Sequence, residues 1–347
     1  MSHPPAPLRL TLDGAALVDN WRTLARLGGR AACGAAVKAN GYGLGAHEVV
    51  AKLAGAGCRD FFVATWAEAE ALGPLPPGFN LSVLHGVRAD DMGVALQSAA
   101  RPVLNSLAQV ARWKEADGGP CDVMVDTGMN RLGLSPEEAR SGILKGMRIA
   151  TLMSHLACAD EPDHPLNAQQ LFTFRTLQGF VKAQHYSLAN SAGIGLGGRY
   201  AFNLTRPGIA LYGGVPFPAM AADVRRVVRI EAEVLQLREV APGQTVGYGG
   251  TFAVHEAMRL AILNIGYADG YLRCLAGAGG AFAGDVRCPL VGRVSMDLIA
   301  VDASRAEVGE GDMLEIDYDL PSAARASGLS QYELLTGLGR RYQRRWT

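Results

Sequence analysis

A lysine followed by closely spaced glycines stands near the start of the chain. Lys38 ends the apolar run AVK, and the stretch ANGYGLGA that follows places glycines at positions 41, 43 and 45. Partial burial would lower the pKa of the amine, and a neutral amine can form an imine with a carbonyl compound. Glycines permit tight turns and the close approach of a ligand. The ordinary alternative is a solvated lysine in a Gly-rich surface loop.

Further residues of chemical interest lie in short motifs along the chain. Arg206 stands directly before a Pro-Gly pair in TRPGIALYG, and Ser191 lies in NSAG. Arg131 lies in the Gly-rich VDTGMNRLGL, where a fixed guanidinium could hold a carboxylate. His155 lies in SHLACAD, and VGYGGTF and IGYADGY each place a tyrosine beside small residues. Taken alone, these motifs have ordinary alternatives that are the commoner outcome: a salt bridge at the rim for Arg206, a core histidine for His155 and turns for the tyrosines.

The elements that would position these residues follow an alternating pattern. From about residue 11 to 225, short apolar runs such as DFFVAT, LSVLHG, CDVMVDTG and ALYGG alternate with helical patterns such as LVDNWRTLARLGG. Strands separated by helices form parallel βαβ units, and about eight of them indicate an α/β fold with an N-terminal (β/α)8 TIM barrel. Lys38 then lies at the mouth of the barrel, and late loops such as NSAG are the usual phosphate seat of this fold.

The pattern changes after about residue 226. VVRIEAEVLQLREVAPGQTVGYGGTF alternates apolar and polar residues around a Pro-Gly turn, which is typical of antiparallel strands. We therefore expect a barrel over residues 11–225 and a mostly antiparallel β domain over 226–347. Residues 5–12 could add a strand to the second domain, and SQYELLTGLGRRY predicts a terminal helix.

The composition excludes several classes of protein. Lys plus Arg and Asp plus Glu both number 33, so the charge balance indicates neither a nucleic-acid partner nor an anionic membrane surface. The longest uncharged stretch is too short and too rich in Pro and Gly to span a bilayer. No signal peptide is evident, and six scattered cysteines without a CxxC pair indicate reduced thiols, a cytoplasmic setting and no metal site.

Taken together, the motifs resemble those of the alanine racemase family, which are fold type III pyridoxal-phosphate enzymes. The resemblance covers nearly the whole chain and rests on eight motifs in the family's order. These are AVKANGYGLGA, VDTGMNRLG, SHLACAD, NSAG, RPGIALYG, VGYGGTF, IGYADGY and VGRVSMD.

The resemblance implies a two-base racemisation of alanine with pyridoxal phosphate as cofactor. Lys38 would carry the cofactor as an internal aldimine and move the proton on one face of the α-carbon. Tyr248 would act on the opposite face. A phenol with an ordinary pKa of about 10 is a poor base at neutral pH, so neighbouring positive charge would have to lower its pKa.

The resemblance also assigns residues to the cofactor and the substrate. Arg206 would face the pyridine nitrogen, with His155 supporting it. The phosphate would be bound by Tyr42, Ser191, Gly208 and Ile209. The substrate carboxylate would contact Arg131 and the backbone at Met296, whereas Tyr267 and Asp297 would line the substrate's path.

Family members form head-to-tail homodimers in which the β domain of one subunit covers the barrel mouth of the other. Tyr248, Tyr267 and Met296 would then act on the partner's site, and a monomer would be inactive. D-alanine made by such an enzyme serves as a peptidoglycan precursor, and the same reaction also serves D-alanine breakdown.

Two positions depart from the family's pattern. Many members carry a carbamylated lysine that orients the arginine, and this chain has Met124 there. Arg131 must then be steadied by another group, such as Asn130, a water or an anion. Some members have a phosphate-binding tyrosine where this chain has Arg340, with Tyr342 nearby.

Four alternatives remain at the level of the sequence. Met124 leaves open a racemase of serine or of a basic amino acid. A decarboxylase of the same fold, a non-catalytic pyridoxal-phosphate carrier and a cofactor-free Schiff-base aldolase are the others. The GYG after Lys38 and Tyr248 in VGYGGT favour a racemase over a decarboxylase, and the β domain argues against a carrier.

Overall fold

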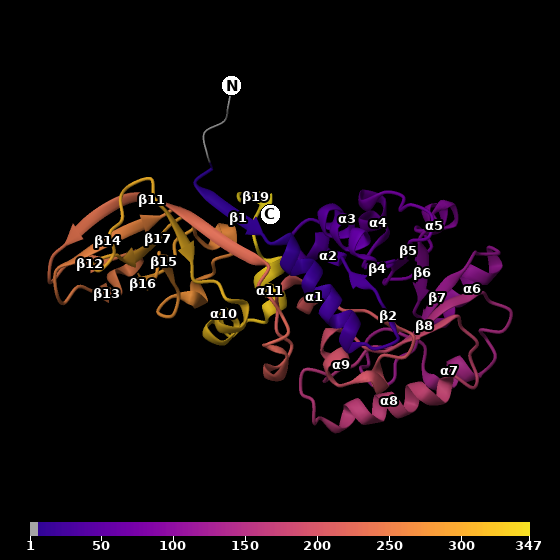
Figure 1. Ribbon diagram of the computed structural model, residues 1–347. Coiled ribbons are helices and arrows are strands. Elements are labelled where there is room, and N and C mark those ends of the chain that lie inside the picture. The colour runs from indigo at the N-terminus through magenta and orange to yellow at the C-terminus, as the bar shows by residue number, and fades with distance from the viewer. Residues whose placement is uncertain (1–5) are drawn as a thin grey trace. The chain divides into compact units, whose positions relative to one another are not determined.

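The computed structural model describes residues 6–347 as two compact units (Figure 1). One unit spans Leu17–Arg225, and the other combines residues up to Ala16 with Arg226–Thr347. Residue 5, where the additional strand was expected to begin, lies outside the described residues. The two units confirm the predicted sequence of a parallel barrel and a mostly antiparallel β fold.

The first unit is built on a ring of parallel strands. Seven of them form one sheet in chain order: β3 (Ala35–Ala36), β4 (Asp60–Val63), β5 (Asn80–Val83), β6 (Arg101–Leu104), β7 (Cys121–Met124), β8 (Ile149–Met153) and β9 (His185–Ser187). The ring closes through β10 (Leu204–Thr205), which pairs with β2 (Ala32–Cys33). Backbone bonds from Asn203 N to Tyr186 O (3.1 Å) and from Arg206 N to Ala189 O (2.9 Å) join β10 to β9.

Helices follow most of these strands on the chain. They are α1 (Gly14–Leu27), α2 (Lys38–Tyr42), α3 (Ala46–Ala56), α4 (Trp66–Leu72), α5 (Met92–Gln97), α6 (Leu107–Glu115), α7 (Pro136–Arg140), α8 (Pro165–Leu177) and α9 (Ser191–Gly195). The helices α4, α6 and α7 begin at Thr65, Ser106 and Ser135, whose side chains accept a backbone N–H of the first turn. These caps fix where each helix starts relative to the strand before it.

The last strand of the barrel differs from the prediction. ALYGG was expected to be a strand, but Ile209–Tyr212 form a 3-10 turn, and the eighth strand is the two-residue β10. The run is fully buried, so it carries no alternation that could separate a strand from a helical turn.

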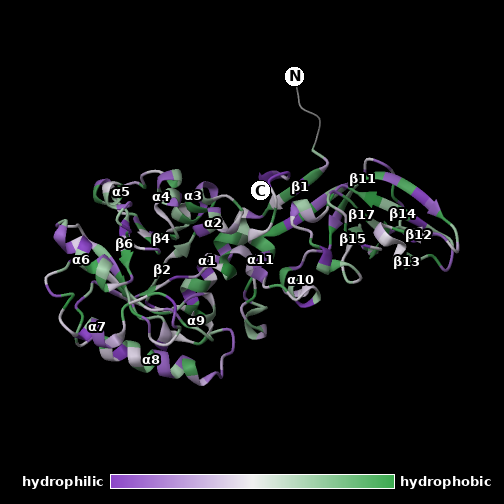
Figure 2. Cartoon of the chain, turned by 180° about the vertical axis from the view of Figure 1, so that it is seen from behind, coloured by the Kyte–Doolittle hydropathy of each residue, from purple (hydrophilic) through white to green (hydrophobic). Residues whose placement is uncertain are grey.

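The second unit is a curved sheet in the order β14-β17-β16-β15-β18-β11-β1-β19. Its strands are β1 (Leu8–Leu12), β11 (Val228–Val240), β14 (Met258–Leu263), β15 (Gly280–Ala283), β16 (Val286–Val291), β17 (Ile299–Asp302), β18 (Met313–Ile316) and β19 (Gln343–Trp346), with a small hairpin of β12 (Thr245–Val246) and β13 (Phe252–Ala253). The long strand β11 pairs with β1 and β18 and, beyond a bulge, with β14, which closes the sheet on itself. Its first half alternates buried and more exposed residues. Figure 2 shows bands of hydrophobic and hydrophilic colour along this strand.

The predicted terminal helix is shorter than expected. Helix α11 covers only Gln331–Thr336, after a further helix α10 (Leu320–Ser327), and the residues that follow form strand β19 beside β1. The glycines at 337 and 339 interrupt the helical pattern before Arg340, which explains the earlier end.

Candidate active site

Lys38 stands where a buried strand changes into a left-handed turn. Val37 N donates to Phe62 O across the β3–β4 pair (2.8 Å), and the half-buried Lys38 follows. The next four residues, Ala39 to Tyr42, make up the rest of the short element α2 and all have positive φ, between 53° and 63°, so α2 is a left-handed turn rather than an ordinary α-helix. Left-handed backbone costs about 1–2 kcal/mol for each residue other than glycine. The surrounding structure must therefore hold this turn.

Side chains from the turn and from α4 hold it. Glu68 accepts a hydrogen bond from Ala39 N through Oε1 and another from Ala64 N through Oε2, both at 2.7 Å. Asn40 Oδ1 accepts from Ala46 N at 2.9 Å, at the start of α3. Glu68 lies outside the motifs of the sequence, although Thr65 and Glu68 have the spacing of a helix N-terminal capping pair.

The environment of Lys38 lowers the pKa of its amine. Burial lowers the pKa of the amine below its ordinary 10.5, the positive charge of Arg131 lowers it further, and Glu68 opposes both. An uncharged amine can act as a nucleophile or as a base. Lys38 is therefore partly buried, as expected from the sequence, and it lies just after strand β3.

Arg206 is a buried cation inside the barrel, only 6% exposed. Its Nη1 donates to Ser187 Oγ, and its Nη2 donates to Ser154 O at 2.5 Å. Burial lowers the pKa of Arg206 to about 10, and the negative charge of Asp122 opposes that change. Asp122 is fully buried and accepts from Ser82 Oγ at 2.5 Å. Asp122 is thus a counter-charge in the barrel that the motifs did not reveal.

His155 lies among the same cations. Burial, and then the positive charges of Arg206, Arg131 and Lys38, lower the pKa of His155 to about 3. The imidazole is therefore neutral near pH 7. Because these three cations act on one histidine, the four residues predicted from separate motifs gather at one place in the barrel.

Arg131 is exposed at the edge of this cluster, in a loop shaped by a carboxylate. Asp126 accepts backbone hydrogen bonds from Gly128 and Met129 through Oδ1 (2.8 Å each) and from Arg131 through Oδ2 (2.7 Å). Burial raises the pKa of Asp126, but these N–H donors outweigh it and the pKa is lowered overall. The carboxylate therefore fixes the backbone at Arg131.

Met124 packs against the same loop at Gly133. The side chain is buried, and a Cβ added to Gly133 would lie 3.1 Å from its Cγ. Met124 thus contributes a buried, uncharged side chain beside the loop that carries Arg131. Asp126 makes the hydrogen bonds that fix the backbone of this loop. That Asn130, a water or an anion steadies the guanidinium of Arg131 stays a prediction.

The four residues expected around a phosphate also come together. Ser191 Oγ accepts from Gly208 N at 2.8 Å and from Ala210 N at 3.3 Å, beside Ile209. A Cβ added to Gly208 would lie 2.2 Å from Tyr42 Oη, so the tyrosine hydroxyl reaches the backbone at this glycine. Tyr42 is held by stacking on Tyr212, with ring centroids 4.6 Å apart.

The second unit carries the remaining predicted residues on adjoining loops. Tyr248 begins a 3-10 turn and is 64% exposed, and Met296 is 53% exposed. Tyr267 N donates to Ser295 O and Ala268 N donates to Met296 O, both at 3.0 Å. These bonds hold the Tyr267 turn against the loop of Met296 and Asp297.

Gly292 and Arg293, at the start of that loop, approach the Tyr248 turn. A Cβ on Gly249 would lie 3.2 Å from Arg293 Nη1, and one on Gly292 would lie 2.9 Å from Val246 O. One loop therefore contacts both tyrosine-bearing turns. The guanidinium of Arg293 also brings positive charge to the turn of Tyr248.

Two residues at the C-terminal end lie near these loops. Arg341 binds Asp269, which lies in the GYADG turn, and also binds Asp297. The neighbouring Arg340 is exposed. Tyr342 is buried and its hydroxyl donates to Asp269 O at 2.9 Å. The role of Arg341 could not be read from the sequence, because the run GRRYQRR contains several arginines and nothing in their spacing marks Arg341.

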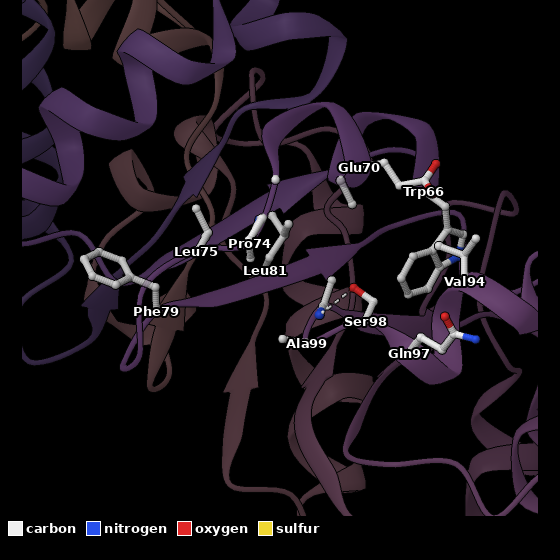
Figure 3. A pocket seen from close by; sticks show the side chains of 13 residues that line it. Trp66, Glu70, Pro74, Leu75, Phe79, Leu81, Val94, Gln97, Ser98 and Ala99 are labelled. Carbon is white, nitrogen blue, oxygen red and sulfur yellow. Dashed lines mark hydrogen bonds between the residues drawn. The ribbon is translucent and has the colours of Figure 1, made fainter.

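A separate cavity of about 380 Å³ lies on the outer layer of the barrel unit, between α4, α5 and the start of β5 (Figure 3). Its lining includes Trp66, Phe79 and Leu81, and Glu70 is its one ionisable residue. Within residues 6–347 no group of three or more His, Cys, Asp or Glu side chains could hold a metal ion. No helix in that range is both long and apolar enough to cross a membrane.

Comparisons with known proteins cover nearly the whole chain. The family profile described as "Alanine racemase, N-terminal domain" matches residues 12–216, and "Alanine racemase, C-terminal domain" matches residues 227–346. Two relatives from Agrobacterium fabrum are named "Alanine racemase, biosynthetic" (42% identical, 98% of this chain and 94% of the relative) and "Alanine racemase, catabolic" (44% identical, 96% and 91%). The crystal structure of alanine racemase from Bartonella henselae with covalently bound pyridoxal phosphate is 36% identical, with a TM-score of 0.92 over 99% of this chain and 100% of that one.

Proposed function

Because this chain belongs to the alanine racemase family, we propose that it interconverts L-alanine and D-alanine with pyridoxal phosphate as its cofactor. The observation that carries the proposal is the gathering of Lys38, Arg131, His155 and Arg206 at one place in the barrel. Relatives bearing this name match nearly the full length of the chain. The reaction is an isomerisation, so the product has the composition of the substrate.

The residues of the barrel fit a cofactor that carries a phosphate. Arg131, Arg206 and the protonated form of Lys38 place positive charge around one histidine, so the site favours anionic groups. Gly208 leaves room that a side chain would fill, with Tyr42 Oη and Ser191 Oγ beside it and Ile209 next along the chain. Arg206 offers its guanidinium from within the barrel. When bound, pyridoxal phosphate supplies an electron-withdrawing ring that stabilises negative charge on the α-carbon of the amino acid.

Two bases on opposite faces of the α-carbon would perform the inversion. A single base tends to return a proton to the face from which it came, so racemisation needs a second one. The lowered pKa of Lys38 suits its amine for taking and returning the proton on one face. Tyr248 would exchange the proton on the other face through its phenolic oxygen, with Arg293 near its turn.

The other side chains would bind and orient. Arg131 would hold the substrate carboxylate, on a backbone fixed by Asp126, together with the backbone at Met296. Arg206 remains protonated at neutral pH with a pKa of about 10, so it would donate a hydrogen bond to the ring nitrogen of the cofactor. A neutral His155 beside it adds no further charge. Tyr267 and Asp297 would line the path of the substrate.

We infer a homodimer in which the loops that carry Tyr248 and Met296 complete the active site of the partner subunit. Tyr248 and Met296 are more than half exposed within their own unit, whereas proton transfer at carbon needs a site sheltered from water. A barrel mouth of a second subunit would provide that shelter. Mixing Lys38→Ala with Tyr248→Phe tests the arrangement, because half of the reassorted dimers would then hold one intact site, giving about a quarter of the wild-type activity. No recovery after demonstrated subunit exchange would contradict the shared site.

Six free cysteines support a reducing cytoplasmic setting for this activity. There the enzyme would form D-alanine for peptidoglycan precursors. The Agrobacterium relatives named biosynthetic and catabolic are 42% and 44% identical to this chain, so the chain is about equally similar to an enzyme named for D-alanine synthesis and to one named for its breakdown.

Optical rotation tests the proposed function directly. Purified protein with added pyridoxal phosphate is incubated separately with L-alanine, L-serine, L-lysine and L-arginine. We expect loss of rotation with L-alanine and much slower loss with the other three. Faster loss with another amino acid would change the substrate, whereas a bound cofactor with no loss for any of them would contradict a racemase.

A further inference from the structure

Glu68 connects three parts of the barrel at the position of Lys38. Its two carboxylate oxygens accept from Ala39 N and Ala64 N at 2.7 Å each. Ala39 directly follows Lys38, and Ala64 follows strand β4. Glu68 itself is fixed at the start of α4, where its backbone N–H donates to Thr65 Oγ1 at 3.2 Å.

The residues on either side of Lys38 in the chain are each held by a backbone hydrogen bond. Before it, Val37 N donates to Phe62 O of β4, and after it, Ala39 N donates to Glu68. Ala39 also begins the left-handed turn, which an alanine adopts only when its surroundings impose it. The carboxylate therefore stabilises the conformation that sets the direction of the lysine side chain.

Glu68 also differs in charge from the other groups that act on Lys38. Arg131, from the loop after β7, lowers the pKa of the amine, and Glu68, from α4, raises it. His155, after β8, is neutral near pH 7 and adds no charge. Glu68 is thus the anion that opposes the effect of burial and of Arg131 on this amine.

We propose that Glu68 is a positioning residue for Lys38, which holds the left-handed turn in place and provides a negative charge beside the residue that carries the amine. This inference rests on the proposed role of Lys38 as the cofactor-bearing base. The same carboxylate would thus have two effects. It would orient the lysine side chain, and it would limit how far burial and Arg131 lower the pKa of the amine.

The test compares Glu68→Gln with Glu70→Gln. Glu70 lies on the same short helix, is exposed, and loses the same charge in its variant. The chain has only five lysines, so trace acetylation over a range of pH, read peptide by peptide in a mass spectrometer, follows Lys38 separately. The full chain freed of cofactor is used for this titration, with the exposed Lys182 as internal reference.

Removing the negative charge at Glu68 must lower the pKa of Lys38. We expect Glu68→Gln to shift the acetylation midpoint of Lys38 downward by about half a pH unit or more. Glu70→Gln should leave it unchanged. In the racemase assay the acid side of the pH profile of kcat, which reports the enzyme–substrate complex in which the Lys38 amine is free, should move to lower pH, whereas a merely structural change would lower activity equally at every pH.

Hydrogen exchange of the cofactor-loaded enzyme measures the positioning. Glu68→Gln and Glu68→Ala should speed amide exchange in a peptide covering residues 38–45, and Glu68→Asp should lie between them and wild type. Faster exchange confined to helix α4 would overturn the proposal, as would an unshifted Lys38 titration. Neither readout requires turnover, so a wild-type protein that fails to racemise alanine would refute the proposed function separately.

Discussion

Arg341 binds Asp269 through two parallel hydrogen bonds. Its Nε and Nη2 each donate to one carboxylate oxygen at 2.7 Å, and its Nη1 donates to Asp297 Oδ1 at 2.5 Å. Asp269 is only 1% exposed and also accepts from Gly266 N at 3.0 Å. One guanidinium therefore joins the turn that carries Tyr267 to the loop that carries Met296 and Asp297.

Replacing Arg341 should loosen both loops. We expect Arg341→Gln to lower the free energy of unfolding by about 1–3 kcal/mol, because a buried carboxylate loses its partner while the arginine itself was half exposed. KM for alanine should rise several-fold more than kcat falls. Steady-state kinetics and thermal unfolding measure both effects.

Arg345→Gln is the matched control for this prediction. Arg345 is an exposed arginine of strand β19 in the same unit, so its loss should change neither KM nor stability appreciably. Equal effects of the two substitutions would show that Arg341 acts only through net charge.

A methyl group at Gly208 should block the phosphate position. Its Cβ would lie 2.2 Å from Tyr42 Oη. An overpacking cost of about 1–3 kcal/mol would weaken pyridoxal-phosphate binding roughly ten- to a hundredfold. Fluorescence titration of Gly208→Ala measures this. Gly198→Ala, which would meet no atom within 4 Å, should bind the cofactor like wild type.

Removing the hydroxyl of Tyr248 should affect the two enantiomers unequally. In Tyr248→Phe, the loss of the α-proton should slow by about 10²–10⁴-fold for the enantiomer whose proton faces the tyrosine. The other enantiomer still meets Lys38 and should exchange much faster. Proton NMR in D₂O follows both exchanges, and equal losses for the two enantiomers would refute the two-base assignment.

His155 should make the folded state less stable in acid. Its pKa is about 3 when folded against an ordinary 6.5, so the unfolded chain takes up more protons between these values. The contribution of this residue to stability should therefore fall as pH drops from 6.5 towards 3. Thermal unfolding at several pH values should show a smaller acid loss for His155→Asn than for wild type. The exposed His255→Asn serves as control and should follow wild type.

The barrel could be predicted because its strands and motifs follow each other in chain order. Lys38, Arg131, His155 and Arg206 all belong to short motifs near the C-terminal ends of strands, where a parallel barrel brings side chains together. The sequence was less informative where burial removes the pattern, as at Ile209–Tyr212, which form a turn rather than a strand.

The supporting residues could not be predicted for a different reason. Glu68 and Asp126 act on backbone N–H groups, and Asp122 acts inside the barrel. Each depends on how a carboxylate is aimed in three dimensions, and Asp and Glu in such positions look like ordinary helix caps or loop residues in the sequence. Arg341 binds residues some 44 and 72 positions earlier in the chain.

The pairing of β1 with β19 affects how the chain folds during synthesis. Thr347 N donates to Leu12 O at 3.0 Å, and the residues so joined are 335 positions apart. The barrel residues 17–225 are translated between the two strands and have contacts of their own, so they can fold first. The β sheet, however, cannot gain its edge strand until residues 343–346 have left the ribosome. Its assembly is therefore late and slow, and a chain interrupted a few residues early would expose β1 as an unpaired edge open to aggregation.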